Sequence, residues 1–585
     1  MLTRINKIWK VAPIDHARVS LLAAELNVPM PLAAILLSRG VENRVQAERF
    51  FSPSLADLPS PFLMKGMTEA VKVVLQALAN QTPVIVYGDY DVDGTTGAAL
   101  LYLFLKKIGF TETYVCQPHR LHDGYGLHLE AIRRIVPPGL LERTPLVITV
   151  DCGISSHQQV RELRDLGCMV IVTDHHQPPD ELPEAEAVLD PQQKDCSFPE
   201  KHLAGVGVAF YLAMGIRKSM HEQGLFGAET GREIPNLKSY LDLVAVGTVA
   251  DMVPIIGINR TIVKAGLEVL GASGRPGFVQ LNKVSGIADS GITCEDIGFR
   301  IGPRLNAAGR MGDAGRALDL LVTEDHGRAA ELAQELNSEN ELRKSVLEAM
   351  CQEALVQAET AVKEGKNGLI ITGEGWHSGV IGIGAARMVE KFNRPTLFFT
   401  TLDGIAKGSG RSVNGVNLYE ILKEKDELFT AFGGHEAAVG LTLPQENLSA
   451  LEAHFQQRLG EIATDTMFMP KVTIAWHEEN GSIFGPEFLQ MYEKMGPFGM
   501  GNPEPVFSAQ GMAEKPREVG VNHLKFTVRF NGAILDGIGF GLAGDFQGLI
   551  EGGQPLNVAF RLRRNTYRNK TSWQVEAVDF KQLSS

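Results

Sequence analysis

Cysteine is scarce in this sequence, and the few cysteines present form no metal or disulfide pattern. The 585 residues include six cysteines at scattered positions, without a Cys-x-x-Cys pair. Their distribution argues against a zinc knuckle or a disulfide framework and is typical of a reducing compartment, so we expect a cytoplasmic protein. The N-terminal stretch MLTRINKIWKVAPID also lacks the apolar segment of a signal peptide.

Long hydrophobic runs are missing as well. The longest obvious run, ALLYLFL at 99–105, is far shorter than the ~18 to 20 residues that span a bilayer, so no membrane partner is expected. Basic residues are outnumbered, 56 against 69 acidic ones, for a net charge of −13. This balance argues against a uniformly basic nucleic-acid binder, although local basic clusters remain compatible with such binding.

The composition is that of a globular protein, with 44% hydrophobic and 21% charged residues. Strand-like PVIVY (83–87) precedes helix-like TTGAALLYLFLKKIG (95–109), and the alternation that follows predicts a buried parallel sheet. We therefore expect an α/β protein with two α/β lobes joined by a long helix, plus a C-terminal β-barrel. The expected parts are an N-terminal helical segment (1–65), a first lobe (66–320), the connecting long helix (321–365), a second lobe (366–462), and a connector with the barrel (463–585).

Acids and imidazoles stand at the ends of successive apolar runs. These residues are Asp89, Asp91 and Asp93 after PVIVY, Asp151 after PLVITV, Asp174, His175 and His176 after MVIVT, and Asp251 after LVAVGTVA. In an open α/β sheet, ligands bind outside the carboxyl ends of the strands, so these side chains are expected at one rim. Each motif alone is compatible with an acidic turn or a helix cap. Together they favour a cation site, and oxygen and imidazole ligands without thiolate suit Mg²⁺ or Mn²⁺.

The order of GDYDVDG, VDCG, TDHH and VGTVADMVP resembles the four motifs of the DHH phosphoesterases. Further segments resemble the RecJ family of single-strand-specific exonucleases: PHRLHDGYGL (118–127), GFRIGPRLNAAGRMGDA (298–314), LNSENELRK (336–344), GWHSGVIGIGAARMVEKFNRPT (375–396), GSGRS (408–412) and FGGHEAAVG (432–440). The resemblance runs from about residue 60 to the end. It implies that the two lobes are a DHH domain and a DHH-associated domain, and that the barrel is an OB-fold.

The resemblance also implies a set of metal ligands for two divalent cations, Mg²⁺ or Mn²⁺. The implied ligands are Asp91, Asp93, Asp151, His175 and Asp251, with Asp89 beside them as a ligand or as support for one. Asp151 is expected to bridge the two ions and His176 to contact the scissile phosphate. Tyr87 stands where some relatives have a histidine ligand, which leaves the coordination of the first metal open.

Several residues are implied in substrate binding. By resemblance, Arg120, Ser409 and Arg411 form a pocket for a terminal 5′ phosphate, and Gly433-Gly434-His435 resembles a nucleic-acid loop in which His435 assists catalysis. In GPRLNAAGR, the residues expected to bind phosphate or DNA are Arg304, Asn306 and Arg310. Forked guanidinium donors beside glycines suit phosphate, whereas a lone arginine is most often solvated.

The barrel sequence NVAFRLRRNTYRNKTSWQV (557–575) holds a basic and aromatic patch. Its cations are Arg561, Arg563, Arg564, Arg568 and Lys570, interleaved with Phe560, Tyr567 and Trp573. Cations for phosphates and aromatic faces for bases are typical of an OB-fold that binds single strands, although a charged hairpin tip has the same composition.

The resemblance implies a 5′→3′ exonuclease that degrades single-stranded DNA to 5′-mononucleotides in recombination and mismatch repair. The implied partners are single-stranded DNA, a single-strand-binding protein and a RecQ-like helicase. One alternative is a DHH phosphodiesterase for nanoRNA or cyclic dinucleotides, whose chains usually lack the barrel. Another is a non-catalytic RecJ-like replication scaffold, which the presence of all the acids and both histidines disfavours.

Overall fold

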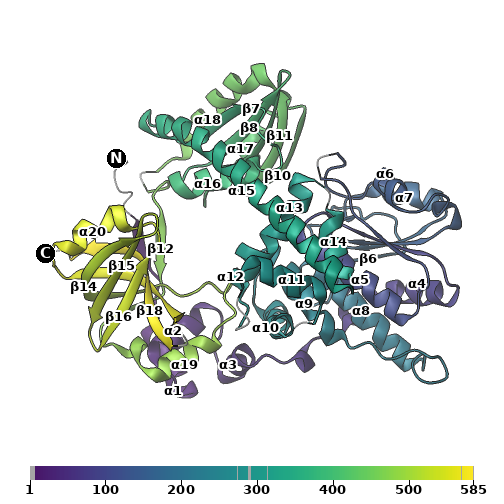
Figure 1. Ribbon diagram of the computed structural model, residues 1–585, viewed down its shortest axis with the longest axis horizontal. Coiled ribbons are helices and arrows are strands. Elements are labelled where there is room, and N and C mark those ends of the chain that lie inside the picture. Colours follow the sequence, from purple (N-terminus) through teal and green to yellow (C-terminus); the bar gives the residue numbers. More distant parts are fainter. Residues whose placement is uncertain are drawn as a thin grey trace. The chain divides into compact units, whose positions relative to one another are not determined.

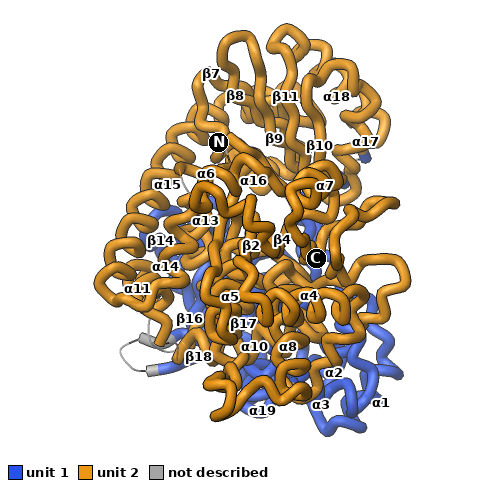
Figure 2. Tube along the Cα trace, turned by 90° about the vertical axis from the view of Figure 1, so that its right-hand side faces the viewer, with its two compact units in different colours: residues 1–53, 464–498, 502–585 blue, residues 54–463, 499–501 orange. Residues whose placement is uncertain are grey.

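The computed structural model describes residues 7–120, 122–272, 274–287, 291–312, 314–464, 466–567 and 570–583. The chain forms two compact units, which are coloured separately in Figure 2. Unit 1 comprises residues 1–53, 464–498 and 502–585, and unit 2 comprises residues 54–463 and 499–501.

Unit 2 begins with a parallel sheet in the strand order β3-β2-β4-β5-β6. Its strands are β2 (Val84–Gly88), β3 (Thr113–Cys116), β4 (Leu146–Val150), β5 (Met169–Thr173) and β6 (Ala187–Leu189). The chain places β3 on one side of β2 and then β4 on the other side. The sheet therefore has a topological switch point between β2 and β4, where open α/β sheets bind their ligands.

Helices cover both faces of this sheet, which explains why its strands are continuous apolar runs. One face packs on α4 (Met67–Ala79), α5 (Val92–Ile108) and α8 (Gly205–Glu222), and the other on α6 (Leu129–Ile135) and α7 (His157–Asp165). The first lobe continues with α9 (Leu241–Ala250), α10 (Gly257–Gly271), α11 (Pro276–Ser285), α12 (Cys294–Asp296), a π-helical turn (Ile297–Ile301), α13 (Gly302–Met311) and α14 (Gly315–Val322).

The connecting helix α15 (His326–Lys363) is one continuous helix of 38 residues, as the sequence predicts. The side chain of Asp325 caps its start by accepting from the backbone N–H of Arg328. No proline or glycine interrupts it after Gly327. In Figure 1, α15 runs between the helices of the first lobe and the sheet of the second lobe.

The second lobe is a mixed sheet in the order β10-β11-β9-β8-β7. Its strands are β7 (Leu369–Glu374), β8 (Thr396–Leu402), β9 (Ile405–Arg411), β10 (Ala431–His435) and β11 (Ala438–Pro444). Only the β7–β8 pair is parallel among these. The helices of this lobe are α16 (Ile381–Phe392), which packs on β8 and β9, α17 (Leu418–Lys423) and α18 (Leu448–Ile462).

Unit 1 combines the two ends of the chain. Its elements are β1 (Ile8–Val11), α1 (His16–Leu26), α2 (Met30–Ser38), α3 (Arg44–Phe51), β12 (Lys471–Ile474), β13 (Trp476–Glu478), α19 (Pro486–Lys494), β14 (Phe507–Val519), β15 (His523–Phe530), β16 (Ala533–Gly539), α20 (Ala543–Glu551), β17 (Leu556–Tyr567) and β18 (Lys570–Gln582). The order β14-β15-β16-β18-β17 closes into a barrel because β17 also pairs with β14. Leu32 and Leu36 of α2 share one hydrophobic core with Phe507 and Phe560 of this barrel.

No single helix among the described residues is long and apolar enough to cross a membrane, and α1 and α2 reach that length only as a pair bent by 111°.

Candidate active site

The acidic turn after β2 leads directly into α5. Asp91 caps this helix, because its Oδ1 accepts from the backbone N–H groups of Asp93 at 2.9 Å and of Gly94 at 3.1 Å. A Cβ at position 94 would come within 2.5 Å of the Asp89 backbone nitrogen, so only glycine allows this close turn. The turn thus holds three aspartates at the carboxyl end of β2.

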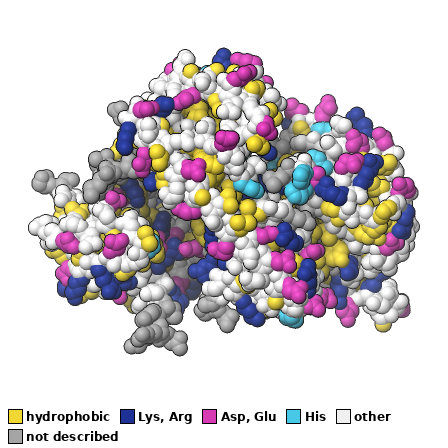
Figure 3. Space-filling view, turned by 45° about the horizontal axis from the view of Figure 1, so that its top comes forward, with side chains coloured by type: hydrophobic (Ala, Val, Ile, Leu, Met, Phe, Trp, Pro, Cys, Tyr) yellow, Lys and Arg dark blue, Asp and Glu magenta, His cyan; other side chains and the backbone are white. Residues whose placement is uncertain are grey.

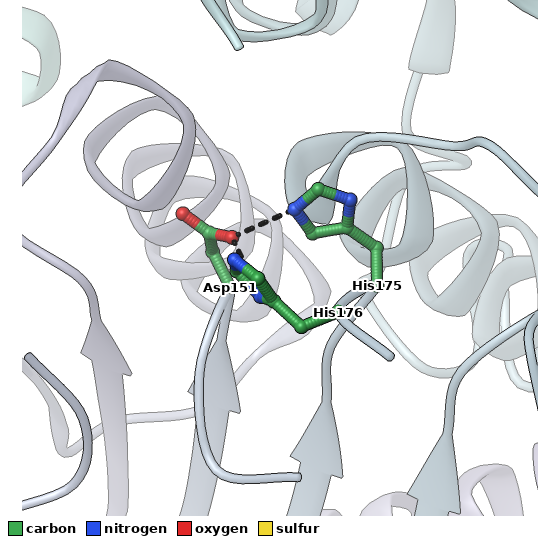
Figure 4. A group of neighbouring side chains, drawn as sticks. All are labelled: Asp151, His175 and His176. Atoms are coloured by element: carbon green, nitrogen blue, oxygen red, sulfur yellow. Dashed lines mark ion pairs between the residues drawn. The ribbon is translucent and has the colours of Figure 1, made fainter. Parts of the chain in front are cut away.

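Asp151 follows β4, across the switch point from this turn. Its φ of 62° lies in the left-handed region, which aspartate tolerates better than most residues. Its Oδ1 lies 3.1 Å from Nε2 of His175 and 3.8 Å from Nδ1 of His176. Figure 4 shows both imidazole rings turned toward this one carboxylate oxygen.

Asp251 follows a helix, since the apolar run before it forms α9 and Asp251 caps its C-terminus. Its Oδ2 lies 3.6 Å from Nε2 of His175, and Oδ2 of Asp93 lies 3.8 Å from the same nitrogen. Asp93 is fixed by the backbone N–H groups of Gly205 and Val206, at 2.5 Å and 2.8 Å, at the start of α8. His175 therefore stands among carboxylates from three different elements.

Burial and mutual repulsion raise the pKa values of four carboxyl groups in this cluster. Burial is the largest cause in each case, and a neighbouring carboxylate, Asp91 or Asp93, is the second. The pKa values of Asp89 and Asp151 lie well above the ordinary value, that of Asp93 rises to about 7, and that of Asp251 rises to about 9. These groups are costly to ionise together without a nearby positive charge.

The donor atoms present fit hard divalent cations. Oδ1 of Asp89, Oδ1 of Asp151 and Nε2 of His175 are buried and make no hydrogen bond. Burial, and then the charge of His176, lowers the pKa of His175 to about 4, so its ring is neutral and can offer a lone pair. Three sets of ligand atoms lie within 4.8 Å of one another: Asp89, Asp91 and Asp151; Asp93, His175 and Asp251; and Asp151, His175 and His176. Carboxylates with imidazole suit Mg²⁺ and Mn²⁺.

His176 is held by two partners: Asp174, which the sequence places at the rim without a specific role, and Tyr125, which it does not single out. Its Nδ1 lies 2.8 Å from Oδ1 of Asp174 and 3.1 Å from the hydroxyl of Tyr125. Burial lowers the pKa of His176, but the hydrogen bond and charge of Asp174 outweigh this effect and raise it to about 9. Both partners belong to quoted motifs, TDHH and PHRLHDGYGL, and only the folded structure brings them to the same ring.

Tyr87, where some relatives have a histidine, faces the core beneath α6 and α7. Its hydroxyl donates to the carbonyl of Gly126 at 2.9 Å and accepts from the backbone N–H of His128 at 3.2 Å. Tyr87 therefore fixes the loop that carries Tyr125.

The register of the second-lobe sheet brings other expected residues onto one face. Two rows cross β9, β11 and β10: Arg411, Ala438 and His435 in one, and Ser409, Gly440 and Gly433 in the other. Alternate residues share a face, so these two rows lie on the same side of the sheet, and Gly434 lies between them in β10. Arg411 donates to Oγ of Ser409 at 3.0 Å and to the Gly410 carbonyl at 2.7 Å.

Arg310 on α13 is half-buried and donates to the carbonyl of Gly379 at 3.2 Å. Burial, followed by the charges of Arg120, Arg343 and Arg411, lowers its pKa to about 9. None of these four arginines forms an ion pair within the described part of the chain. The charge of Asp91 acts on Arg310 in the opposite direction, but with no ion pair formed the cluster still has guanidinium donors to offer an anion.

Arg304, unlike Arg310, makes its hydrogen bonds inside the first lobe. Its guanidinium is buried and donates to Oδ1 of Asn337 at 3.0 Å, to the Arg300 carbonyl at 2.8 Å and to the Val284 carbonyl at 3.4 Å. These bonds tie α13 to neighbouring helices and leave the side chain facing the interior. Asn306, also on α13, is half-buried.

The three barrel arginines lie on β17, and each contacts a carboxylate of unit 1. The pairs are Arg561 with Glu576 at 2.9 Å, Arg563 with Glu504 at 3.0 Å, and Arg564 with Glu493 at 3.0 Å. Part of their positive charge is thus balanced within the protein. Arg568 and the side chains of Tyr567 and Lys570 lie outside the described residues. On the face in Figure 3, basic and acidic side chains are interspersed.

Three family models match successive parts of the chain. The DHH family N-terminal domain matches residues 83–248, the DHHA1 domain matches 365–461, and the RecJ OB domain matches 482–579. The parallel sheet with its acidic rim, followed by the second lobe, thus defines a DHH phosphoesterase.

The particular family follows from full-length relatives. The Escherichia coli protein named single-stranded-DNA-specific exonuclease RecJ is 38% identical over 569 residues, which cover 94% of this chain and 96% of that protein. The Bacillus subtilis protein of the same name is 35% identical over 582 residues, covering 98% and 70%. The chain belongs to the RecJ family.

Solved structures agree with this assignment. RecJ from Thermus thermophilus in complex with Mn²⁺ has a TM-score of 0.81 at 30% identity, covering 100% of this chain and 81% of that one. The same protein in complex with Mg²⁺ has a TM-score of 0.76 at 28% identity, covering 99% and 79%. The predicted fold, two α/β lobes and an OB barrel, is confirmed.

Proposed function

We propose that this chain is a metal-dependent exonuclease that degrades single-stranded DNA from its 5′ end and releases 5′-mononucleotides. The observation that carries the proposal is the cluster at the β2–β4 switch point, where buried carboxylate and imidazole atoms make no hydrogen bond. The relatives named above are single-stranded-DNA-specific exonucleases, and the barrel is of the RecJ OB type. The cofactors are two divalent cations, Mg²⁺ or Mn²⁺.

The chain's own residues prepare the metal site. Asp89, Asp91 and Asp151 would hold one cation and Asp93, His175 and Asp251 the other, with Asp151 placed to serve both. When bound, the cations supply the Lewis acidity that activates water and stabilises the leaving oxygen of a phosphodiester. Backbone N–H donors already orient Asp91 and Asp93, so little reorganisation is needed when the substrate arrives.

Two histidines contact the phosphate chain. In the metal-free protein, against the effect of burial, the Asp174 carboxylate raises the pKa of His176 to about 9, and Asp174 and Tyr125 occupy its Nδ1, which leaves Nε2 to donate to a scissile phosphate oxygen. His435 is exposed on β10, and its Nδ1 accepts from the backbone N–H of Ala437 at 3.3 Å. Its Nε2 is then free to donate to a neighbouring phosphate.

Arg120, Ser409 and Arg411 bind the terminal 5′ phosphate and so set the polarity of digestion. A metal site alone treats every internal phosphodiester alike, whereas a terminal monoester carries an extra charged oxygen. Arginine forks with a hydroxyl can recognise that oxygen. Arg310 adds positive charge to this pocket, and Asn306, Gly433 and Gly434 border the path of the strand.

The cellular role we propose is recombinational and mismatch repair in the cytosol, together with a single-strand-binding protein and a RecQ-like helicase. All six cysteines are buried free thiols, which suits a reducing compartment. An enzyme limited to single strands needs a partner that unwinds duplex DNA. In the barrel, Arg561, Arg563 and Arg564 would contact the strand by exchanging part of their ion pairing for phosphate.

The test is digestion of end-labelled single-stranded DNA, duplex DNA and dinucleotides, each with Mn²⁺ and with EDTA. We expect degradation of the single strand alone and complete inhibition by EDTA. Comparable digestion of duplex DNA, a preference for dinucleotides, or activity in EDTA would contradict the proposal.

A further inference from the structure

Arg120 is the least anchored arginine of the proposed phosphate pocket. Arg411 is held by Ser409 and the Gly410 carbonyl, and Arg310 is held by the Gly379 carbonyl. Among the described residues, Arg120 makes neither a hydrogen bond nor an ion pair. Its guanidinium instead lies over the ring of Tyr90, with Cζ 4.8 Å from the ring centroid.

Tyr90 is itself well placed to hold another side chain. It stands between Asp89 and Asp91 in the turn before α5, and α13 packs against its backbone. A Cβ on Gly309 would approach the Tyr90 carbonyl oxygen to 3.1 Å and its Cβ to 3.8 Å. The Tyr90 hydroxyl makes no hydrogen bond within the described part of the chain. Tyr90 therefore contacts Arg120 through the face of its ring.

We propose that Tyr90 is a positioning residue of the terminal-phosphate pocket, acting through a cation–π contact with Arg120. A guanidinium stacked on a ring keeps its in-plane N–H donors free, and those donors are the ones that bind phosphate oxygens. This inference rests on the proposed function of Arg120. If so, the turn that carries the proposed metal ligands also carries Tyr90, which supports Arg120. This arrangement fixes the spacing between the terminal phosphate and the first cleaved bond.

The experiment compares kcat/KM for matched oligonucleotides that differ only in a 5′ phosphate or a 5′ hydroxyl. The variants are Tyr90→Phe and Tyr90→Trp, which keep an aromatic face, and Tyr90→Leu and Tyr90→Met, which remove it. The aromatic variants should keep the wild-type preference within about twofold, and the aliphatic ones should lose about fivefold to thirtyfold of it. Mn²⁺ binding, measured by titration calorimetry, should be alike in all of them. Two aliphatic variants are used so that the test can still be made if one of them does not fold.

A double-mutant cycle assigns the effect to Arg120. In an Arg120→Ala background, Tyr90→Leu should cause no further loss of the preference. If Tyr90→Leu and Tyr90→Met slow both substrates equally and keep their ratio, Tyr90 acts only through the metal-bearing turn and the inference is overturned. If the wild type shows no preference for a 5′ phosphate, the proposed phosphate pocket itself is wrong. That result differs from a preference that is present in the wild type and persists in Tyr90→Leu and Tyr90→Met, which contradicts only the role of Tyr90.

Discussion

Aspartates of the metal cluster have a second task as parts of the backbone. Asp91 caps α5, Asp93 accepts from the start of α8, and Asp151 occupies a left-handed conformation after β4. These constraints place charged oxygens at one rim and raise the pKa values of Asp89, Asp93 and Asp151. The local folding of the chain and the chemistry of the site therefore depend on the same side chains.

Replacing Asp151 should remove hydrolysis without unfolding the protein. We expect Asp151→Asn to lower the rate by ~10² or more, because the set of Asp89, Asp91 and Asp151 loses a charged ligand and His175 of the other set loses the carboxylate 3.1 Å from its Nε2. Asparagine also tolerates the left-handed φ, so the variant should fold. Single-turnover digestion measures the loss, with Asp180→Asn on the exposed surface as control. More than about a tenth of the wild-type rate in Asp151→Asn would sink the assignment.

Tyr125→Phe should slow the chemical step and leave substrate affinity unchanged. The variant keeps the ring but removes one of the two groups that hold Nδ1 of His176, together with the hydrogen bond that the Tyr125 hydroxyl donates to the Asp151 carbonyl at 3.3 Å. Losing a hydrogen bond of about 0.5 to 1.5 kcal/mol predicts a fall in kcat of roughly threefold to tenfold. The matched control is Tyr102→Phe, whose hydroxyl contacts only Lys106 on α5 among the described residues. A change confined to KM would show that Tyr125 binds substrate without orienting His176.

Stabilisation by Mn²⁺ should increase with pH. In the metal-free protein the pKa values of Asp93 and Asp251 are about 7 and about 9, against 3.8 ordinarily. The folded state thus keeps protons that the unfolded chain loses, and its stability falls as pH rises from about 4 to about 9. Cations replace those protons, so the gain in Tm on adding Mn²⁺ should be larger at about pH 8 than at about pH 6. An equal gain in Tm at about pH 6 and about pH 8, in the wild type and in Asp251→Asn alike, would contradict this account.

Most of the proposed metal ligands can be named from the sequence because they follow apolar runs at recognisable positions, and their role as ligands stays a prediction. It places Asp174 at the rim without a role, and it does not single out Tyr90 or Tyr125, whose roles depend on contacts with side chains farther along the chain. Nor does it separate Arg304 from Arg310. Both stand in one glycine-rich motif, and only packing shows that Arg304 bonds to interior oxygens.

At the scale of elements, regular periodicity is read well from sequence and long-range pairing is not. The helix α15 and the strand β2 lie, to within a few residues, where the sequence places them. The run before Asp251 is apolar throughout, so its pattern cannot distinguish a buried strand from the buried helix α9. The N-terminal helices read as a separate segment because nothing local indicates that they join the core of a barrel more than 400 residues later.

The shared core of unit 1 can be tested at its N-terminal side. Leu36→Ala should destabilise the barrel by about 2 to 5 kcal/mol, because Leu36 is fully buried in the core that includes Phe507 and Phe560. Urea unfolding gives the change in the free energy of unfolding, and hydrogen exchange of the backbone amides in β17 and β18 shows whether the barrel is affected. The control is Leu21→Ala, at a position that is 73% exposed, which should leave the stability of the barrel unchanged. Unaltered protection of the barrel amides in Leu36→Ala would mean that the helices form an independent domain.

At the scale of the whole molecule, an acidic protein handles a polyanion by concentrating positive charge in one place. The net charge is −13, yet Arg120, Arg310, Arg343 and Arg411 gather without ion-pair partners in the described part of the chain. Carboxylates that need cations and arginines that need anions lie in the same compact unit. A strand end whose phosphates meet the arginines, with cations between DNA and carboxylates, satisfies both sets of charges.

The most direct measurement of this account follows digestion of one sequence in two forms, a 5′-phosphorylated, 3′-labelled linear single strand and the closed single-stranded circle. With Mn²⁺, the linear strand should shorten from its 5′ end one nucleotide at a time and release its label last, while the circle stays intact. EDTA should stop the reaction. Nicking of the circle, or release of the 3′ label in the first turnovers, would contradict an exonuclease that starts at the 5′ phosphate.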